Sequence, residues 1–169
     1  MSTAMARRED VAELVRIVNA AYAEGEAGLW VDGTPRTDEE EIDAAVRAGE
    51  MLVETVDERV VGCVRVRALH DAMWEIGLVS ADPAAWGSGV GRDLVRAAEH
   101  RARSHGATTI RLTLLVPRES VHAAKERLRK WYTRLGYVVV GSVPFEDAVP
   151  HAAPHLTAPC DLLLFTKPT

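Results

Sequence analysis

The residue types best suited to chemistry in this chain cluster in a short loop between a predicted strand and a predicted helix. The loop reads Trp86-Gly87-Ser88-Gly89-Val90-Gly91-Arg92. Glycines at alternate positions allow sharp turns of the backbone and a close approach by a ligand. The first amides of the following helix point outward at the positive end of the helix dipole, which attracts an anion. The loop therefore predicts an anion site, and a pyrophosphate is its natural ligand.

Two common nucleotide motifs do not match this loop. A Walker loop requires Gly-Lys-Ser/Thr, whereas Gly91 is followed by Arg92 and Asp93. The dinucleotide fingerprint reads G-x-G-x-x-G, whereas the spacing here is G-x-G-x-G, and no second βαβ unit is evident. A glycine turn without a ligand and a mononucleotide-binding protein remain as alternatives.

Two further side chains carry groups that could hold or move a proton. Tyr132 lies near the end of a predicted helix, in the segment Trp131–Tyr137, and its hydroxyl is a hydrogen-bond donor. It also shares an apolar helix face with Leu128 and Leu135, so a core aromatic is the alternative interpretation. Glu75 lies in the strand before the glycine loop, and its position alone indicates an exposed strand carboxylate.

The hydrophobic pattern predicts the elements that position these residues. Helices are expected after Asp10, from about Thr37, from Val90 to Gly106 and from Val121 to Gly136. Tight turns are expected at Asp57-Glu58 and at His70-Asp71. The expected strands span about 51–56, 59–68, 72–81, 110–116, 137–143 and 161–166, with a proline-rich loop between the last two. This order predicts one mixed α/β domain over residues 1–169.

Charge and composition narrow the class of partner. The net charge of −5 and the isoelectric point near 5.7 argue against nucleic acid or an anionic membrane as the main partner. No apolar run approaches the roughly 20 residues of a membrane span, and the N-terminus lacks the apolar segment of a signal peptide. Cys63 and Cys160 match no metal spacing and are expected to be buried, unreactive thiols. A reducing cytoplasm is the expected location.

The segment from Trp74 through the glycine loop resembles the central motif of the GNAT superfamily of N-acyltransferases. That motif runs from a strand through hydrophobic-x-Pro to Arg/Gln-x-x-Gly-x-Gly/Ala and a helix, and Gly89 and Gly91 fall on its glycine positions. Trp86 departs from the motif, which usually has Arg or Gln there. Trp131–Tyr137 resembles the second family signature, aromatic-Tyr-x-x-x-Gly-Phe/Tyr. The resemblance covers about residues 4–145, is strongest over 74–95 and 131–145, and points to a subgroup without an assigned substrate.

This resemblance implies a single-domain GNAT fold, with a mixed, mostly antiparallel sheet flanked by helices and a splayed central parallel pair. It implies that the strand Tyr137–Val143 is the parallel neighbour of Glu75–Ala81. Acetyl-CoA is the implied cosubstrate, with pantetheine amides pairing along the strand and the pyrophosphate lying on loop amides. The implied cofactor-binding residues are Val79, Ser80, Ala81, Trp86, Gly87, Ser88, Gly89, Val90, Gly91 and Arg92.

The implied reaction is direct attack of an amine on the acetyl thioester, with Glu75 as the base and Tyr132 donating to the departing sulfur. The expected acceptor is a primary amine of a small molecule; a protein N-terminus or lysine, and a non-catalytic acetyl-CoA sensor, are the alternatives. Two imidazoles in a proline-rich loop do not predict a metal site. The resemblance also allows a homodimer. The expected acceptor contacts are Trp30, Arg36, His70, His151 and His155.

Overall fold

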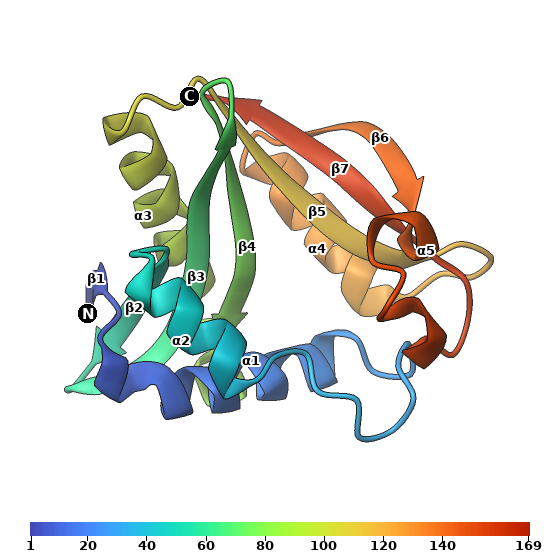
Figure 1. Ribbon diagram of the computed structural model, residues 1–169, viewed down its shortest axis with the longest axis horizontal. Coiled ribbons are helices and arrows are strands. Elements are labelled where there is room, and N and C mark those ends of the chain that lie inside the picture. Colours follow the sequence, from blue (N-terminus) through green and yellow to red (C-terminus); the bar gives the residue numbers. More distant parts are fainter. The chain divides into compact units, whose positions relative to one another are not determined.

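The computed structural model describes all 169 residues, which form two compact units (Figure 1). The first unit consists of Met1–Glu24, Pro35–Ile110 and Thr169. The second consists of Gly25–Thr34 and Arg111–Pro168. The expectation of a single domain over residues 1–169 stays a prediction.

Four antiparallel strands form the sheet of the first unit, in the order β1 (Ser2–Met5), β2 (Met51–Val56), β3 (Arg59–His70) and β4 (Met73–Ala81). The hairpin at Asp57-Glu58 is confirmed, and both residues have positive φ (48° and 64°), as a two-residue turn between twisted strands requires. The next turn is at Asp71 and Ala72 (φ 45° and 59°), one residue later than expected, because His70 pairs with Met73 as the last residue of β3. The short strand β1 was not expected.

The three long helices of this unit agree with the sequence-based expectation. They are α1 (Val11–Gly25), α2 (Glu39–Arg47) and α3 (Val90–Ser104). Asp38 caps α2 by accepting from the Glu41 amide at 2.9 Å. Asp10 does not cap α1: it lies in a 3-10 turn, Arg8–Asp10, and its carboxylate accepts from the Arg7 amide at 2.7 Å.

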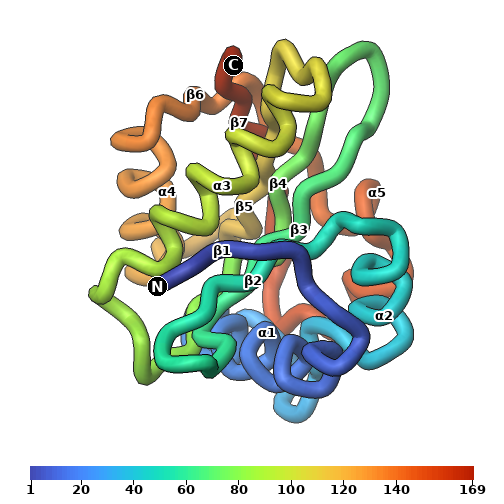
Figure 2. The backbone as a smooth tube through the Cα atoms, turned by 90° about the vertical axis from the view of Figure 1, so that its left-hand side faces the viewer, coloured from blue at the N-terminus to red at the C-terminus, as the bar shows by residue number.

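The helices cover both faces of the first sheet (Figure 2). Gly62 of β3 lies under α3, where a Cβ atom would approach Val90 to 2.7 Å and Leu94 to 3.0 Å. The adjacent Cys63 belongs to a core cluster with Leu14 of α1 and with residues of α2. Because neighbouring strand residues face opposite sides of a sheet, α3 covers one face and α1 with α2 cover the other.

The second unit contains β5 (Thr109–Pro117), β7 (Cys160–Pro168) and β6 (Val138–Pro144), in that strand order. Its helices are α4 (Ala123–Arg134) and α5 (Phe145–Ala148), with a 3-10 turn at Ala153–His155. The placement of Tyr137–Val143 beside Glu75–Ala81 is wrong. The returning C-terminal strand β7 pairs with β6, which leaves β6 at the edge of the sheet.

Two groups of buried side chains form the core of the second unit. One surrounds Tyr137 and Phe165, which have no exposed surface. The other joins Leu29, Leu115, Phe145 and Cys160. Phe145 begins α5, a short helix inside the segment that was expected to be only a loop. No helix of the chain is long and apolar enough to cross a membrane.

Candidate active site

The glycine loop leads from the end of β4 into α3, as the sequence predicts. Gly87 and Gly89 both have positive φ (81° and 94°), the region that glycine enters most easily. Gly89 is the N-cap of α3, where no side chain caps the first turn. The Asp93 amide makes the first helical hydrogen bond, to Gly89 O at 3.1 Å. The amides just before it therefore remain available to an anion at the positive end of a 15-residue helix.

The loop side chains fold back onto the loop backbone. The half-exposed Trp86 donates from Nε1 to Ala81 O at 2.9 Å, at the end of β4. Ser88 Oγ donates to Ala85 O at 2.5 Å. A Cβ atom on Gly89 would lie 3.1 Å from Arg92 Nη2, so this guanidinium adds a positive charge beside the helix start. The loop thus has one cation of its own, in addition to the backbone dipole.

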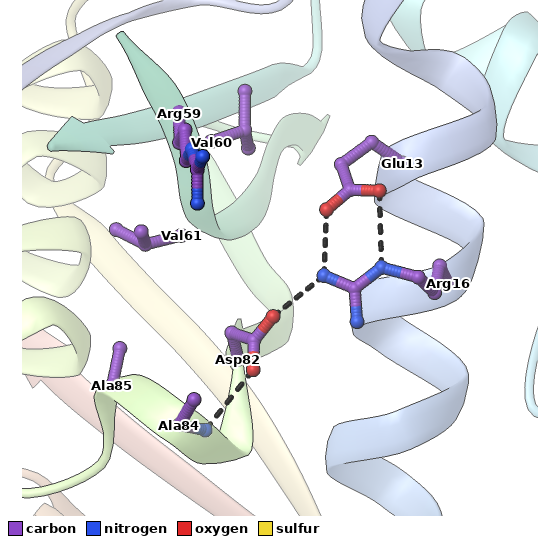
Figure 3. Close-up of a pocket in the computed structure, with 8 residues that line it drawn as sticks. All are labelled: Glu13, Arg16, Arg59, Val60, Val61, Asp82, Ala84 and Ala85. Atoms are coloured by element: carbon purple, nitrogen blue, oxygen red, sulfur yellow. Dashed lines mark hydrogen bonds and ion pairs between the residues drawn. The ribbon is translucent and has the colours of Figure 1, made fainter. Parts of the chain in front are cut away.

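An ion pair ties the start of this loop to α1 (Figure 3). Arg16 Nη2 donates to Asp82 Oδ2 at 2.5 Å, and Asp82 Oδ1 accepts from the Ala84 amide at 3.0 Å. Arg16 also pairs with Glu13 at 2.6 Å. Hydrogen bonds from Arg16 hold the pKa of both carboxyl groups below their ordinary values, and the Ala84 amide contributes for Asp82. A half-open pocket of about 460 Å³ lies between α1 and this turn, on the α1 side of the glycine loop.

A bulge interrupts β4 just before the loop. Cys63 pairs with Ser80 but Arg65 pairs with Gly77, so β4 has one residue more than β3 over this stretch. Leu78, at the bulge, is buried and has φ of +51°, a strained value for a residue other than glycine. Bulges and strained backbone occur preferentially at functional sites. Sequence reasoning missed the bulge, although an isolated glycine in a strand, Gly77, was a usable signal.

The residues of β4 alternate between two environments. Ile76, Leu78 and Ser80 are buried, and Ser80 Oγ donates to Leu78 O at 3.1 Å. Any cofactor contact of Ser80 would therefore come from its backbone. Val79 and Ala81 alternate with these residues and are only half-buried, as Glu75 is. Glu75 lies six residues before Ala81, which is about 20 Å along a strand.

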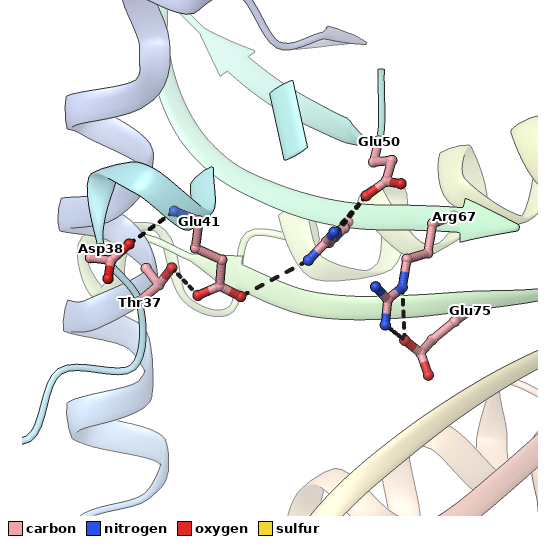
Figure 4. Close-up of polar contacts among 7 residues, drawn as sticks. Thr37, Asp38, Glu41, Glu50, Arg67 and Glu75 are labelled. Atoms are coloured by element: carbon pink, nitrogen blue, oxygen red, sulfur yellow. Dashed lines mark hydrogen bonds and ion pairs between the residues drawn. The ribbon is translucent and has the colours of Figure 1, made fainter. Parts of the chain in front are cut away.

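The carboxylate of Glu75 is held by a guanidinium from the adjacent strand (Figure 4). Arg67 donates to Glu75 Oε1 from Nη2 at 2.8 Å and from Nε at 3.2 Å. A similar pair lies two residues earlier on β3, where Arg65 contacts Glu50 at 2.6 Å. The Arg67 contact fixes the position of Glu75, and the role of this carboxylate as a base stays a prediction.

Tyr132 lies in the aromatic core of the second unit. It is 8% exposed, and its ring centre lies 5.0 Å from that of Trp131, 5.9 Å from Phe165 and 6.2 Å from Tyr137. Its position in α4 follows from the apolar helix face that the sequence shows. The ring is thus part of the core, and the role of its hydroxyl stays a prediction.

Three of the expected acceptor contacts lie in the second unit. Trp30 Nε1 donates to Glu26 Oε1 at 3.0 Å, and its ring meets Phe145 edge-to-face at 5.7 Å. His151 and His155 are exposed in the segment after α5. No group of three or more His, Cys, Asp or Glu side chains could hold a metal ion.

The other two expected contacts lie in the first unit. The Arg36 guanidinium lies 5.0 Å from the ring centre of Tyr22, a cation–π contact. His70 is exposed at the end of β3, and its Nδ1 lies 3.5 Å from Asp71 Oδ2. No contact between Arg36 and His70 brings them together within this unit, and their role at the acceptor stays a prediction.

Sequence reasoning also missed a buried ion pair in the second unit. Lys125 Nζ of α4 donates to Glu26 Oε2 at 2.5 Å, and both side chains are at most 5% exposed. His122 Nε2 lies 2.8 Å from Ala27 O, next to this pair. These contacts fix the segment after α1 to α4. The pairing of Lys125 could not be predicted, because the local helix pattern carries no information about a partner about 100 residues away.

Both cysteines are free and buried, as expected. Burial raises the pKa of Cys63 to about 12 and also raises the pKa of Cys160. Since the thiolate is the nucleophile, neither residue is suited to covalent catalysis near neutral pH.

The family model for the GNAT acetyltransferases matches residues 13–137, so the chain belongs to the GNAT acetyltransferase family. No protein of curated function matches the chain in sequence. Among solved structures, the ribosomal-protein-alanine N-acetyltransferase from Brucella melitensis is similar, with 20% identity, a TM-score of 0.72 and full coverage of both chains. An aminoglycoside 6'-N-acetyltransferase complexed with coenzyme A is 15% identical, with a TM-score of 0.73 over 99% of this chain and 97% of the other. The putative acetyltransferase yncA from Salmonella typhimurium, with acetyl-CoA, is 20% identical, with a TM-score of 0.71 over 99% and 93%.

The chain is therefore a member of the GNAT acetyltransferases with an α/β GNAT fold, and two of these similar structures hold coenzyme A or acetyl-CoA. Its mixed, seven-stranded sheet flanked by helices confirms the expected fold class. The uncapped start of α3 behind two glycines of positive φ fits a pyrophosphate. At these identities the structural neighbours establish the fold and leave the acceptor open.

Proposed function

We propose that the chain transfers the acetyl group of acetyl-CoA to a primary amine of a small molecule by direct attack. The observation that carries this proposal is a set of hydrogen bonds between two loops of the second unit, 25–34 and 149–160. Val31 N donates to His155 O at 2.8 Å, and Thr157 N donates to Leu29 O at 2.9 Å. Thr157 Oγ1 adds a bond to Gly28 O at 2.6 Å. By resemblance to the family, the loops 25–37 and 144–159, which contain most of these two segments, are expected around the acceptor entrance together with the strand ends near His70.

Loops that are bonded to each other favour a small acceptor. An extended peptide needs an open groove or a free strand edge to pair with. Here five backbone groups of the two loops already bond across to the other loop, and Trp30 packs on Phe145 next to these bonds. Acetylation of a protein N-terminus or lysine is the alternative, and it would require the loops to separate.

For the cosubstrate, the pyrophosphate lies on the amides from Gly87 to Arg92, except that of Ser88, which already donates to Ala85 O at 3.3 Å. The pantetheine arm then pairs with Val79 and Ala81 and brings the thioester toward the bulge at Leu78. The Trp86 indole already occupies Ala81 O, so pantetheine pairs there through the Ala81 amide or displaces the indole. At the position where the family usually has Arg or Gln, Trp86 thus makes a hydrogen bond to the end of β4.

The reaction begins with loss of a proton, because an alkyl ammonium has a pKa near 10.4 and cannot attack while it is charged. Glu75 accepts this proton, directly or through water, and Arg67 holds the carboxylate in position. The amine nitrogen then attacks the thioester carbon, the new C–N bond forms and the C–S bond breaks. The second amine proton passes from the nitrogen through water to the departing sulfur, so that CoA leaves as the thiol.

Tyr132 supports the departing sulfur by hydrogen bonding. With the cysteine thiol as a stand-in for CoA, a phenol of pKa about 10 is a weaker acid than a thiol of pKa about 8.5. Complete proton transfer to sulfur would therefore be uphill by about 2 kcal/mol. A hydrogen bond that strengthens as charge develops on sulfur requires no such transfer.

The acceptor class is tested by initial rates of CoA release against small amines and peptides. The small amines are polyamines, amino acids and amino sugars, and the peptides carry a free N-terminus or an internal lysine. We expect kcat/KM for the best small amine to exceed that for the best peptide by about tenfold or more. The reverse order would establish the protein-acetylating alternative.

A loop variant tests the structural reason separately. Thr157→Val removes the hydroxyl that bonds Gly28, and we expect a severalfold higher KM for the small amine with an unchanged KM for acetyl-CoA. Thr133→Val is the matched control, because that hydroxyl bonds only Arg129 O within α4. If Thr157→Val and Thr133→Val had the same KM for the small amine, the bonds between the two loops would not affect acceptor binding.

A further inference from the structure

Two arginines of β3 lie on the face of the first unit's sheet that α1 and α2 cover. Arg65 and Arg67 alternate with Cys63 along the strand, so the three side chains share this face. Each guanidinium contacts a carboxylate there (Figure 4). Ion pairs of this kind are common on a sheet. The two arginines differ in the number of carboxylates that each one meets.

Arg65 lies between two carboxylates, whereas Arg67 contacts one. Arg65 Nη2 lies 2.6 Å from Glu50 Oε2, and its Nη1 lies 4.0 Å from Glu41 Oε1 on the other side. Both bonds of Arg67, from Nε and Nη2, go to a single oxygen, Glu75 Oε1. Its Nη1 donates no hydrogen bond, and the side chain is 39% exposed, against 23% for Arg65. The position that Glu41 fills beside Arg65 therefore has no counterpart beside Arg67.

The open side of Arg67 is suited to an acid group. A guanidinium has five N–H donors in a planar fork, and a carboxylate is the side-chain group that matches this fork best. With Glu75 as the base, the reacting amine lies against the Glu75 carboxylate, whose Oε1 is 2.8 Å from Arg67 Nη2. A substituent next to that amine therefore meets Arg67. The guanidinium attracts an acid group in this place and repels a second cation.

We propose that Arg67 determines the specificity for the acceptor by binding a carboxylate that lies close to the reacting amine, as in an amino acid. The amine and the carboxylate of such a molecule are separated by one carbon, and they match the adjacent opposite charges of Glu75 and Arg67. This role of Arg67 rests on the proposed acetylation of a small primary amine, with Glu75 at the reacting nitrogen. It narrows the acceptor to amines that carry an acid group, and it disfavours polyamines.

Matched acceptors test this role, because an amino acid and its carboxamide carry the same amine and differ in the carboxylate. We expect kcat/KM of the parent chain for the acid to exceed that for the amide by about 10- to 100-fold, measured as CoA release. In Arg67→Gln this ratio should fall to about threefold or less, with most of the change in the KM of the acid. Arg65→Gln is the matched control and should keep the parent's ratio, because both carboxylates around Arg65 belong to the chain itself.

The ratio separates acid binding from the support that Arg67 gives to Glu75. Loss of that support lowers the rates with the acid and the amide together and leaves their ratio unchanged. Lower rates in Arg67→Gln at the parent's ratio would therefore overturn the proposal. So would a parent chain that acetylates the amides as fast as the acids. A parent chain that acetylates neither would instead contradict the proposed function.

Binding of an N-acetyl amino acid gives a readout that needs no turnover. This molecule keeps the carboxylate and lacks the ammonium, so a calorimetric titration in the presence of CoA reports the carboxylate contact. Its dissociation constant should rise about tenfold or more in Arg67→Gln and stay at the parent value in Arg65→Gln. An equal dissociation constant in the parent and Arg67→Gln would overturn the proposal, as would the absence of binding to the parent.

Discussion

Tyr132 combines a packing role, which the structure shows, with a proposed catalytic role for its hydroxyl. Tyr132→Phe keeps the ring and its contacts with Tyr137 and Phe165 and removes only the oxygen. We expect kcat to fall roughly 10- to 1,000-fold, because a hydrogen bond made mainly in the transition state is lost. The dissociation constant of acetyl-CoA should stay near the parent value. Steady-state kinetics with a binding titration measure both, and activity within twofold of the parent would leave Tyr132 with packing alone.

Glu75 is tested by removing its charge without changing its shape. If it accepts the amine proton, Glu75→Gln should lower kcat/KM most near pH 7 and recover in part at high pH, where more of the acceptor is already neutral. Glu50→Gln is the control, since Glu50 has a similar pairing with Arg65 but is not on β4. Parallel pH–rate profiles for parent and Glu75→Gln would exclude Glu75 as the base.

At the scale of single residues, the sequence predicts burial and backbone conformation only where these depend on residues nearby in the chain. The glycine loop, Tyr132 and the two buried cysteines are of this kind. Partners distant in sequence leave no local sign, as with Arg16 and Asp82, which are 66 residues apart, or Glu26 and Lys125, which are 99 apart. The bulge at Leu78 also depends on pairing with β3, although Gly77 hints at it.

At the scale of elements, α3 provides a matched pair of glycines for testing the anion site. Gly89 precedes the helix with φ of +94°, and Gly106 follows it with φ of +87°. Alanine at either position should cost about 1–2 kcal/mol of folding free energy, because the left-handed region is strained for L-residues. Only Gly89→Ala, at the end with unpaired amides, should also weaken acetyl-CoA binding.

The measurement is the rise in melting temperature on adding acetyl-CoA. At 100 times the dissociation constant, binding stabilises the folded chain by about 2.7 kcal/mol. Gly106→Ala should show the parent's rise from a lowered baseline. Gly89→Ala should show a much smaller one. An equal rise in melting temperature in both variants would show that the pyrophosphate does not bind at this loop.

The turn before the glycine loop gives a pH-dependent prediction. The folded-state pKa of Asp82 lies below its ordinary value of 3.8, chiefly through the hydrogen bond from Arg16. The contribution to stability is therefore present above pH 3.8 and is lost as the pH falls through the lowered folded-state value. Asp82→Asn should cost at most about 1 kcal/mol at pH 7, because the partly exposed pair is screened by solvent.

Urea denaturation of parent and variant at pH 7 and at about pH 2 measures this difference, which should shrink at the lower pH. Asp32→Asn serves as the control, because Asp32 is exposed and has no ion pair. If the cost of Asp82→Asn were the same at both pH values, the Arg16 contact would not stabilise the fold through charge.

Most elements could be predicted because their signals are local. Asp57 and Glu58 between two alternating runs give the first hairpin, and the 3.6-residue period after Gly89 gives α3. The neighbour of β4 could not be predicted from such signals. The sequence of a strand does not specify its partner strands. The C-terminal strand β7 lies between β5 and β6, and this pairing made the predicted position of β6 wrong. β1 was missed because four residues show too little alternation.

At the scale of the whole molecule, the glycine loop belongs to the first unit, and the aromatic residues of α4 and the two bonded loops belong to the second. The family membership supports acetyl transfer, and the cosubstrate site and the acceptor are the proposed parts. The net charge of −5 suits a cationic amine better than an anionic acceptor, because attraction at a distance raises the encounter rate. The rate of amine acetylation should accordingly fall as salt is added.

The most direct test of the central claim is CoA release by the purified chain with and without a small primary amine, followed by mass spectrometry of the amine. The account predicts release that depends on the amine and saturates with it, one N-acetylated product for each thiol, and strong loss in Tyr132→Phe. Thiol release at the same slow rate with and without every amine, despite tight acetyl-CoA binding, would contradict it and indicate a sensor of acetyl-CoA.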